Sequence, residues 1–243
     1  MNLSFENIEY SYPGISTPAL QSVGGYIEQG KITAMIGRSG SGKSTLGMIL
    51  KGLMSMKHGG VFLVDSGGVK TKLTDQELLM MVGWTPANPE IQLFANTVHD
   101  EIAFGPSNQG FAGDELEEKV KRAASMVGLD YELFKYRHPL FLSGGEKRLV
   151  ALAGVVAMGF KWYILDEPSV GLDYRGCKSV SRLVSNLAES GSGVCWISHD
   201  IISLKNVAQN VIELKDGRVV NFRSTINFDW NVSLNRMGEG SSN

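Results

Sequence analysis

The sequence predicts an α/β protein built on a parallel β-sheet, with an antiparallel edge and an inserted helical region. Short apolar runs at 32–36, 162–165 and 194–197 have the length and composition of buried strands, and helical segments separate them. Buried strands that alternate with helices form parallel sheets. The stretch from about 88 to 158 interrupts this alternation and is mostly helical. It therefore predicts an insert in the α/β core.

The remaining elements follow from local patterns. Apolar residues alternate along 3–12 with an irregularity near Asn7, which is typical of an antiparallel strand with a bulge. The runs 211–214 and 218–220 flank a glycine turn and predict a hairpin. Residues 114–127 carry a helical apolar stripe, which indicates core packing. We expect one main domain over 1–225, with the helical insert within it, and a polar tail over 226–243 with a frayed end.

Composition limits the classes of function. The chain has 243 residues, of which 43% are hydrophobic, enough for a packed core. A net charge of −2 gives no electrostatic basis for binding nucleic acid. Cys177 and Cys195 are too few and too far apart for a disulfide framework or a metal site, so we expect reduced thiols in a cytosolic protein. Neither a membrane-spanning apolar run nor a signal peptide is found, so any membrane role requires docking on another chain.

The most informative stretch reads GRSGSGKST and begins at Gly37. It fits the pattern G-x-x-x-x-G-K-[ST] between a predicted strand and a helical segment, which is the context in which this loop binds phosphate. The glycines let backbone N–H groups turn inward, and the helix N-terminus completes an anion cradle. Lys43 is predicted to reach the β- and γ-phosphates, and the Ser44 hydroxyl to bind Mg²⁺. The predicted nucleotide-binding residues here are Gly37, Arg38, Ser39, Gly40, Ser41, Gly42, Lys43, Ser44 and Thr45.

Two acids end the apolar strand at 162–165. An acid at the carboxyl end of a strand in an open α/β sheet lies where ligands bind. Asp166 is predicted to hold Mg²⁺, and Glu167 to face the γ-phosphate and polarise the attacking water. An exposed pair of strand-end acids is the plainer interpretation, but the phosphate loop upstream favours the metal and base roles.

A second glycine-containing helix start lies at 142–146. Ser143 and Glu146 have the spacing of a capping box, which explains them structurally. A capping box does not need Gly144 and Gly145, which cost stability at a helix start. Two glycines at this position indicate backbone exposed for an anion.

With these motifs the chain closely resembles the ATPase subunits of ATP-binding cassette (ABC) transporters. LSGGE at 142–146 is similar to the signature LSGGQ, and KWYILDEP at 161–168 to Walker B. SVGLD at 169–173 is similar to the D-loop, and WISHD at 196–200 to the switch histidine segment. Order and spacing agree over about residues 3–220. The resemblance implies an ABC nucleotide-binding domain: a P-loop NTPase, RecA-like core with an antiparallel β edge and an inserted α-helical subdomain.

The resemblance also implies how the site works. Two cassettes stack head to tail, and ATP lies between the phosphate loop of one and residues 143–145 of the other. Tyr12 matches the aromatic residue that stacks on adenine, although a tyrosine here could also belong to the core. His199 would contact the γ-phosphate, and Asp173 of the D-loop is assigned to the nucleotide site.

A finer resemblance concerns VGWTPANPEIQLF at 82–94, which looks like the VGxVFQNPxxQLF segment of energy-coupling factor (ECF) importers. These importers take up vitamins or transition-metal ions, and they pair two similar ATPases with a transmembrane coupling protein and a substrate-binding membrane protein. The chain would then be peripheral, at the cytoplasmic face of the cell membrane. Ala87 stands where the family has its Q-loop glutamine, and alanine can neither ligate Mg²⁺ nor bond the attacking water. We therefore expect unequal ATP sites and a non-identical partner ATPase.

The apolar set Trp84, Ile91, Leu93 and Phe94 is expected to be exposed in a groove around 84–106 that receives a helix of the membrane partner. Burial in the chain's own core is the alternative. Other open functions are an ATPase of another ABC transporter type and a nucleotide-dependent binding subunit with little turnover. A DNA-repair or chromosome-organising ATPase is disfavoured, because the interval between the phosphate loop and the signature contains no sustained heptads.

Overall fold

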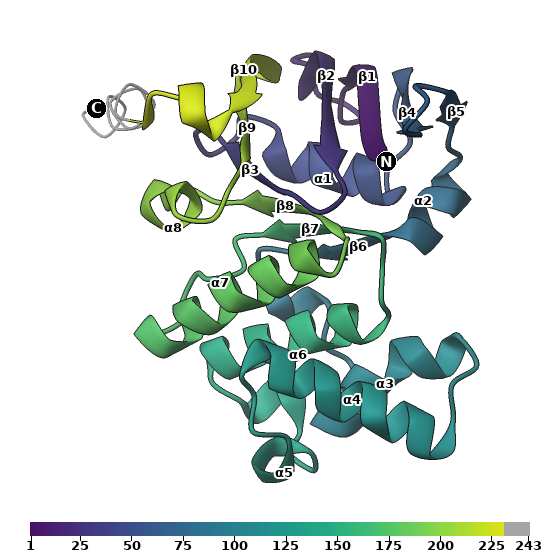
Figure 1. Cartoon of the computed structure of the whole chain (residues 1–243), viewed down its shortest axis with the longest axis vertical. Helices are drawn as coiled ribbons and strands as arrows, with labels where there is room; N and C mark the ends of the chain where they lie inside the picture. The colour runs from purple at the N-terminus through teal and green to yellow at the C-terminus, as the bar shows by residue number, and fades with distance from the viewer. Residues whose placement is uncertain (231–243) are drawn as a thin grey trace.

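The structure, a computed structural model, describes residues 1–230 and contains two β-sheets with helices packed around them (Figure 1). The antiparallel sheet has the order β2-β1-β4-β5 and comprises β1 (Asn2–Tyr10), β2 (Leu20–Glu28), β4 (His58–Val64) and β5 (Lys70–Lys72). The second sheet has the order β10-β9-β3-β8-β7-β6 and comprises β3 (Ile32–Ile36), β6 (Val82–Thr85), β7 (Trp162–Asp166), β8 (Gly193–Ile197), β9 (Asn210–Lys215) and β10 (Arg218–Ser224). All neighbouring pairs in it are parallel except β9 and β10.

Helices cover both faces of the parallel sheet because its central strands are mostly apolar and buried throughout. Every residue of β3, β7 and β8 is buried. One core cluster joins α1 (Lys43–Lys51) and α2 (Asp75–Met81) to the antiparallel sheet and to one face of the parallel sheet. The other cluster joins α7 (Tyr174–Glu189) and α8 (Ile201–Lys205) to the opposite face. This layering is that of a parallel α/β core.

The helical insert lies at the end of the molecule away from the antiparallel sheet (Figure 1). It contains α3 (Val98–Asn108), α4 (Gly113–Val127), α5 (Tyr131–Phe134) and α6 (Gly144–Ala157), together with the short turns Pro89–Ile91 and Pro139–Phe141. The apolar stripe of α4 packs on the same core cluster as α6 and α7. The sequence prediction of a helix over 114–127 is confirmed within one residue.

The predicted bulge in the first strand is also confirmed. Asn7 has a φ of 51°, and the register with both neighbouring strands shifts beside it. The strand ends at Tyr10, so Tyr12 lies in the following loop rather than in the strand. The predicted hairpin is formed by β9 and β10, whose turn places Asp216 and Gly217 at positive φ.

Packed structure continues beyond residue 225. Phe228 and Trp230 are buried, and their rings meet edge to face with centroids 5.0 Å apart. Both belong to the core cluster that contains Leu204 of α8. Residues 231–243, where the expected frayed end falls, lie outside the described residues.

The expected exposed set at 84–94 is wrong for two of its four members. Leu93 is 6% exposed and belongs to the core, and Trp84 is half-buried against the core cluster that contains α1 and α2. Ile91 and Phe94 are 70% and 63% exposed. The difference arises because Leu93 follows a short helical turn that points it inward, while Phe94 after it points outward.

Candidate active site

The carboxyl ends of β3, β8, β7 and β6 lie at one edge of the parallel sheet, and their loops enclose a pocket of about 510 Å³. The loop after β3 contributes Gly37, Ser39, Gly40, Gly42, Lys43, Ser44 and Thr45. The other lining residues are Tyr12, Ala19, Ala87, Asp166, Glu167 and His199. Parallel strands converge their carboxyl ends in this way at the ligand sites of open α/β sheets.

The loop after β3 is shaped as an anion cradle. Gly37 and Gly42 have φ angles of 149° and 102°, and a Cβ at either would lie within 2.7 Å of a backbone oxygen. The Lys43 ammonium closes the loop by donating to the carbonyls of Gly37 at 2.8 Å and Arg38 at 2.9 Å. Burial lowers the pKa of Lys43, while the charges of Glu167 and Asp166 oppose that shift. Because its acceptors are neutral carbonyls, the Lys43 ammonium at the edge of this pocket can rotate to bind a phosphate instead.

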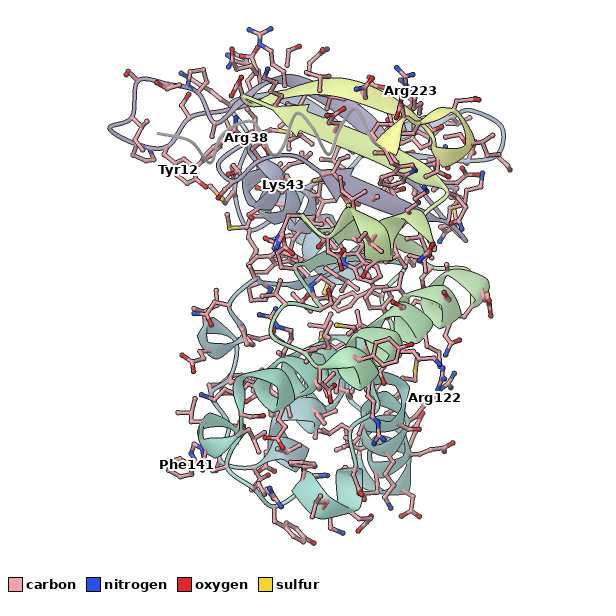
Figure 2. All side chains as sticks on the ribbon, turned by 90° about the vertical axis from the view of Figure 1, so that its left-hand side faces the viewer. Tyr12, Arg38, Lys43, Arg122, Phe141 and Arg223 are labelled. Carbon is pink, nitrogen blue, oxygen red and sulfur yellow. The ribbon has the colours of Figure 1, made fainter. Side chains whose placement is uncertain are left out.

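Tyr12 reaches the same pocket from the loop after β1. Its hydroxyl lies 2.9 Å from the Thr45 hydroxyl, and its ring meets Tyr10 edge to face. Figure 2 shows Tyr12, Arg38 and Lys43 in the upper part of the molecule, with Tyr12 toward its edge. The ring is half-buried and borders the pocket, so it is available to a planar base.

Two oxygen ligands suited to Mg²⁺ lie side by side. Asp166 is 3% exposed, and its carboxylate bonds the Ser44 side chain. Burial raises the pKa of Asp166, and the bond from Ser44 opposes this rise. Residues 1–230 contain no cluster of three or more His, Cys, Asp or Glu side chains that could form an all-protein metal cage. A hydroxyl and a carboxylate beside a phosphate cradle fit Mg²⁺, which takes few protein ligands and completes its shell with phosphate and water.

Glu167 is held at the end of β7 in a strained backbone conformation with a φ of 49°. Its carboxylate accepts a hydrogen bond from the Ser198 hydroxyl at 2.9 Å and from the His199 backbone N–H at 3.1 Å. The His199 ring Nδ1 lies 2.8 Å from the same carboxylate. The Glu167 side chain is 16% exposed and the His199 side chain 70% exposed, so the histidine is the more accessible partner. Non-glycine residues at positive φ gather at functional sites.

Ala87 borders the pocket from the end of β6, whereas Gln92 does not. The Gln92 amide instead donates to the carbonyl of Ala151 at 2.9 Å, on the side of α6. The Gln92 amide therefore does not substitute in the pocket for the Q-loop glutamine that Ala87 replaces.

Two residues of the site were not predicted from the sequence. Ser198 fixes Glu167 as described, and Arg148 donates to the backbone carbonyls of Glu167 and Ala87 at 2.8 Å each. A serine before His199 gave no distinctive signal. Arg148 could have been noticed as a cation on the apolar face of the helix that follows the paired glycines.

The signature residues lie outside the pocket that the phosphate loop forms. Ser143 caps α6 in a capping box with Glu146, and a Cβ on Gly144 would meet nothing within 4 Å. Asp173 caps α7 by accepting from the Gly176 N–H at 2.7 Å. Phe141, just before the signature, lies far below Tyr12 and Lys43 in Figure 2. The chain thus carries two separated halves of the predicted nucleotide contacts.

Known proteins with similar sequences are ATP-binding subunits of ABC transporters. The ABC transporter family model matches residues 20–170. The energy-coupling factor transporter ATP-binding protein EcfA2 of Clostridium perfringens is 39% identical over 227 residues, covering 90% of this chain and 79% of that protein. EcfA2 of Clostridium acetobutylicum is 40% identical over 226 residues, with coverages of 90% and 78%. EcfA of Methanothermobacter thermautotrophicus is 37% identical over 221 residues, with coverages of 90% and 69%.

Solved structures agree with the fold. A dimeric ATP-binding cassette in a post-hydrolysis state, bound to ADP and Pi, matches with a TM-score of 0.81 and 26% identity, covering 93% of this chain and 100% of that one. The cbiO1 protein of Clostridium perfringens, part of the ABC transporter complex cbiONQ, matches with a TM-score of 0.75 and 30% identity, covering 92% and 88%. Within residues 1–230, the helices are all too short or too polar to cross a bilayer.

Proposed function

This chain belongs to the ABC transporter family as an ATPase of the energy-coupling factor type, and from that premise we propose that it powers uptake of a vitamin or a transition-metal ion by membrane partners. The subunit would bind at the cytoplasmic face of the cell membrane through a transmembrane coupling protein. A separate membrane subunit would bind the transported molecule.

One observation carries the proposal. The phosphate loop, Asp166, Glu167 and His199 share one pocket, while residues 143–145 lie apart from it and leave Gly144 open. An ATP bound at the loop therefore lacks the signature contacts until a second cassette supplies them. Binding that is tighter in the paired state shifts the population toward closure. ATP binding would then close the pair, and hydrolysis would reopen it.

The residues divide the chemistry as follows. Lys43 and the backbone of the phosphate loop hold the β- and γ-phosphates, and Tyr12 packs against the base. Ser44 and Asp166 would hold Mg²⁺, which neutralises charge that develops on the phosphate oxygens. Glu167 accepts the proton of the attacking water on a carboxylate that Ser198 and the His199 backbone hold in place. The His199 side chain is exposed and can turn from Glu167 toward the γ-phosphate.

A small apolar surface on the helical insert suits the membrane partner. Phe94 and Phe104 are 63% and 50% exposed, and their rings meet edge to face at 4.7 Å. Ile91, three residues before Phe94, is also exposed. The Glu101 carboxylate accepts from the backbone N–H groups of Phe94 and Ala95, which fixes this loop. Apolar anchors on a fixed loop fit helix-in-groove recognition. We propose that Ile91, Phe94 and Phe104 contact a coupling helix of the membrane partner.

The second ATPase is proposed to be non-identical. Ala87 leaves the site on this chain's own phosphate loop without a water-positioning amide, and Gln92 is engaged with α6. A partner that retains the glutamine would provide one fast site, completed by Ser143 of this chain. A nucleotide-dependent binding subunit with little turnover is the second candidate, and Ala87 is the observation that favours it.

Two variants separate these possibilities in the complex with the partner ATPase that co-purifies from membranes. Lys43→Ala disables the site on this chain's loop, and Ser143→Arg disables the site on the partner's loop. We expect Ser143→Arg to remove most of the ATP turnover and Lys43→Ala to remove little. Equal losses would refute the unequal sites. Failure to recover membrane proteins or a second ATPase with the wild-type chain would refute the transport assignment.

A further inference from the structure

Arg148 is a buried cation that no part of the proposed chemistry has yet used. It lies on α6, five residues after the Ser143 cap, and is 8% exposed. Its two terminal nitrogens donate to the carbonyl oxygens of Glu167 and Ala87, each at 2.8 Å. A planar guanidinium can hold two acceptors in fixed relative positions, which an ammonium cannot do as rigidly.

The first acceptor controls the geometry of the proposed base. Glu167 has a φ of 49°, a conformation that a residue with a side chain adopts only when its surroundings impose it. Its backbone N–H donates to the carbonyl of Ile197 at 2.9 Å, and its carbonyl accepts from Arg148 at 2.8 Å and from the Val170 N–H at 3.3 Å. These bonds fix both sides of the strained residue, and the shorter one from Arg148 helps to direct the Glu167 carboxylate.

The second acceptor, the carbonyl of Ala87, lies at the start of the loop that leads to the exposed Ile91 and Phe94. Other side chains also fasten this loop to the helical insert. Lys147 pairs with Glu90 at 2.6 Å, and Gln92 donates to the carbonyl of Ala151. In the described part of the chain, Arg148 alone among these contacts also reaches the end of β7. A shift of Glu167 on nucleotide binding would therefore move the start of the loop through one rigid side chain.

We propose that Arg148 is a positioning residue that holds Glu167 for water activation and transmits its displacement to the loop at 87–94. In this chain Arg148 connects the nucleotide site to the loop at 87–94, a connection that the short side chain of Ala87 cannot make. The inference rests on the proposed function for the role of the loop, but the two bonds to Arg148 are independent of which molecule is transported.

The first test compares Arg148→Met with Lys147→Met in the full chain. Both replace a cation on the same turn of α6 by an apolar chain of similar length, but Lys147 contacts only Glu90 of the loop. Arg148→Met is expected to lower the kcat for ATP by about tenfold or more, with the KM within about threefold, because phosphate binding is untouched and positioning is lost. Lys147→Met should retain the wild-type kcat. Arg148→Lys should recover part of the loss.

The second test is hydrogen exchange of the peptide 86–96 with and without a non-hydrolysable ATP analogue, adenylyl imidodiphosphate, and Mg²⁺. The wild type and Lys147→Met should change exchange on binding, and Arg148→Met should not, although it binds the analogue. An unresponsive wild-type loop, an unchanged kcat in Arg148→Met, or an equal loss in Lys147→Met would each overturn the inference. If Arg148→Met does not fold by circular dichroism, Arg148→Lys and the wild-type exchange decide the question. A wild type without ATP turnover would instead refute the proposed function.

Discussion

Replacing Ala87 by glutamine is expected to raise the turnover of the ATP site built on this chain's own phosphate loop. Ala87 is exposed and borders the pocket that contains Lys43, Asp166 and Glu167. Its backbone is held by Arg148, so a longer side chain would start from a fixed point. A glutamine there can offer an amide to the attacking water or to Mg²⁺, neither of which alanine can contact.

The size of the effect follows from one added hydrogen bond. Such a bond contributes about 1–3 kcal/mol when its loss leaves a polar group unmatched. Each 1.36 kcal/mol of barrier corresponds to about a tenfold change in rate, so turnover should rise roughly ten- to a hundredfold. The KM for ATP should change little, because Lys43 and the loop backbone are unaltered.

The assay is steady-state ATP hydrolysis by the chain alone, at saturating ATP and Mg²⁺ and a protein concentration that favours pairing. Ala87→Leu is the matched control, since it adds similar bulk without an amide. Gln92→Leu tests whether the second glutamine contributes despite its bond to Ala151. Equal rates for the wild type and Ala87→Gln, or an equal rise in Ala87→Leu, would show that an amide at this position does not position the water.

Two further predictions concern the loop at 87–94 and the partly buried Lys51. Phe94→Asp should detach the chain from membranes with a stability cost below about 1 kcal/mol, because the ring is 63% exposed. Leu93→Asp, at a position 6% exposed, should unfold the chain or lower its free energy of unfolding by about 3 kcal/mol or more. Membrane fractionation measures detachment, and urea unfolding measures stability. A larger loss of stability in Phe94→Asp than in Leu93→Asp would contradict the assignment of Phe94 to the exposed surface. Burial lowers the pKa of Lys51 from 10.5 to about 8, so the unfolded chain binds this proton more tightly between those values and stability rises with pH there. Because the ammonium is only partly buried, the free energy of unfolding relative to Lys51→Met should rise by about 1 kcal/mol from pH 7 to pH 10, and a constant difference in urea unfolding would disprove the shift.

The sequence was sufficient where local pattern and global position agree. The strand, loop and helix around Lys43 were predicted because glycines, an apolar run and a helical segment occur together. The bulge at Asn7 was visible as a break in alternation, and the structure shows it as a residue at positive φ. Strands β2 and β4 were not predicted, because each contains a Gly-Gly pair that weakens the strand signal.

Other features depend on contacts that no local pattern reveals. Leu93 and Phe94 are neighbouring apolar residues, and only the turn before them decides that one is buried and the other exposed. Arg148 is an ordinary helix residue until β7 and the loop after β6 are brought against α6. The separation of Ser143 from the phosphate pocket is likewise a property of the fold, because the helical insert displaces the signature from the end of β3.

ATP hydrolysis measured per chain as a function of protein concentration, for the wild type and Glu167→Gln, shows whether two cassettes must pair before Glu167 can act. The substitution keeps the shape of Glu167 and removes its basicity. We expect Mg²⁺-dependent turnover that increases with concentration in the wild type, as the signature of one cassette reaches the loop of another. Glu167→Gln should bind ATP, lose nearly all turnover and accumulate as a closed pair. Full activity in Glu167→Gln would rule out Glu167 as the base, and wild-type turnover per chain that stays constant on dilution to a monomer would rule out the paired site.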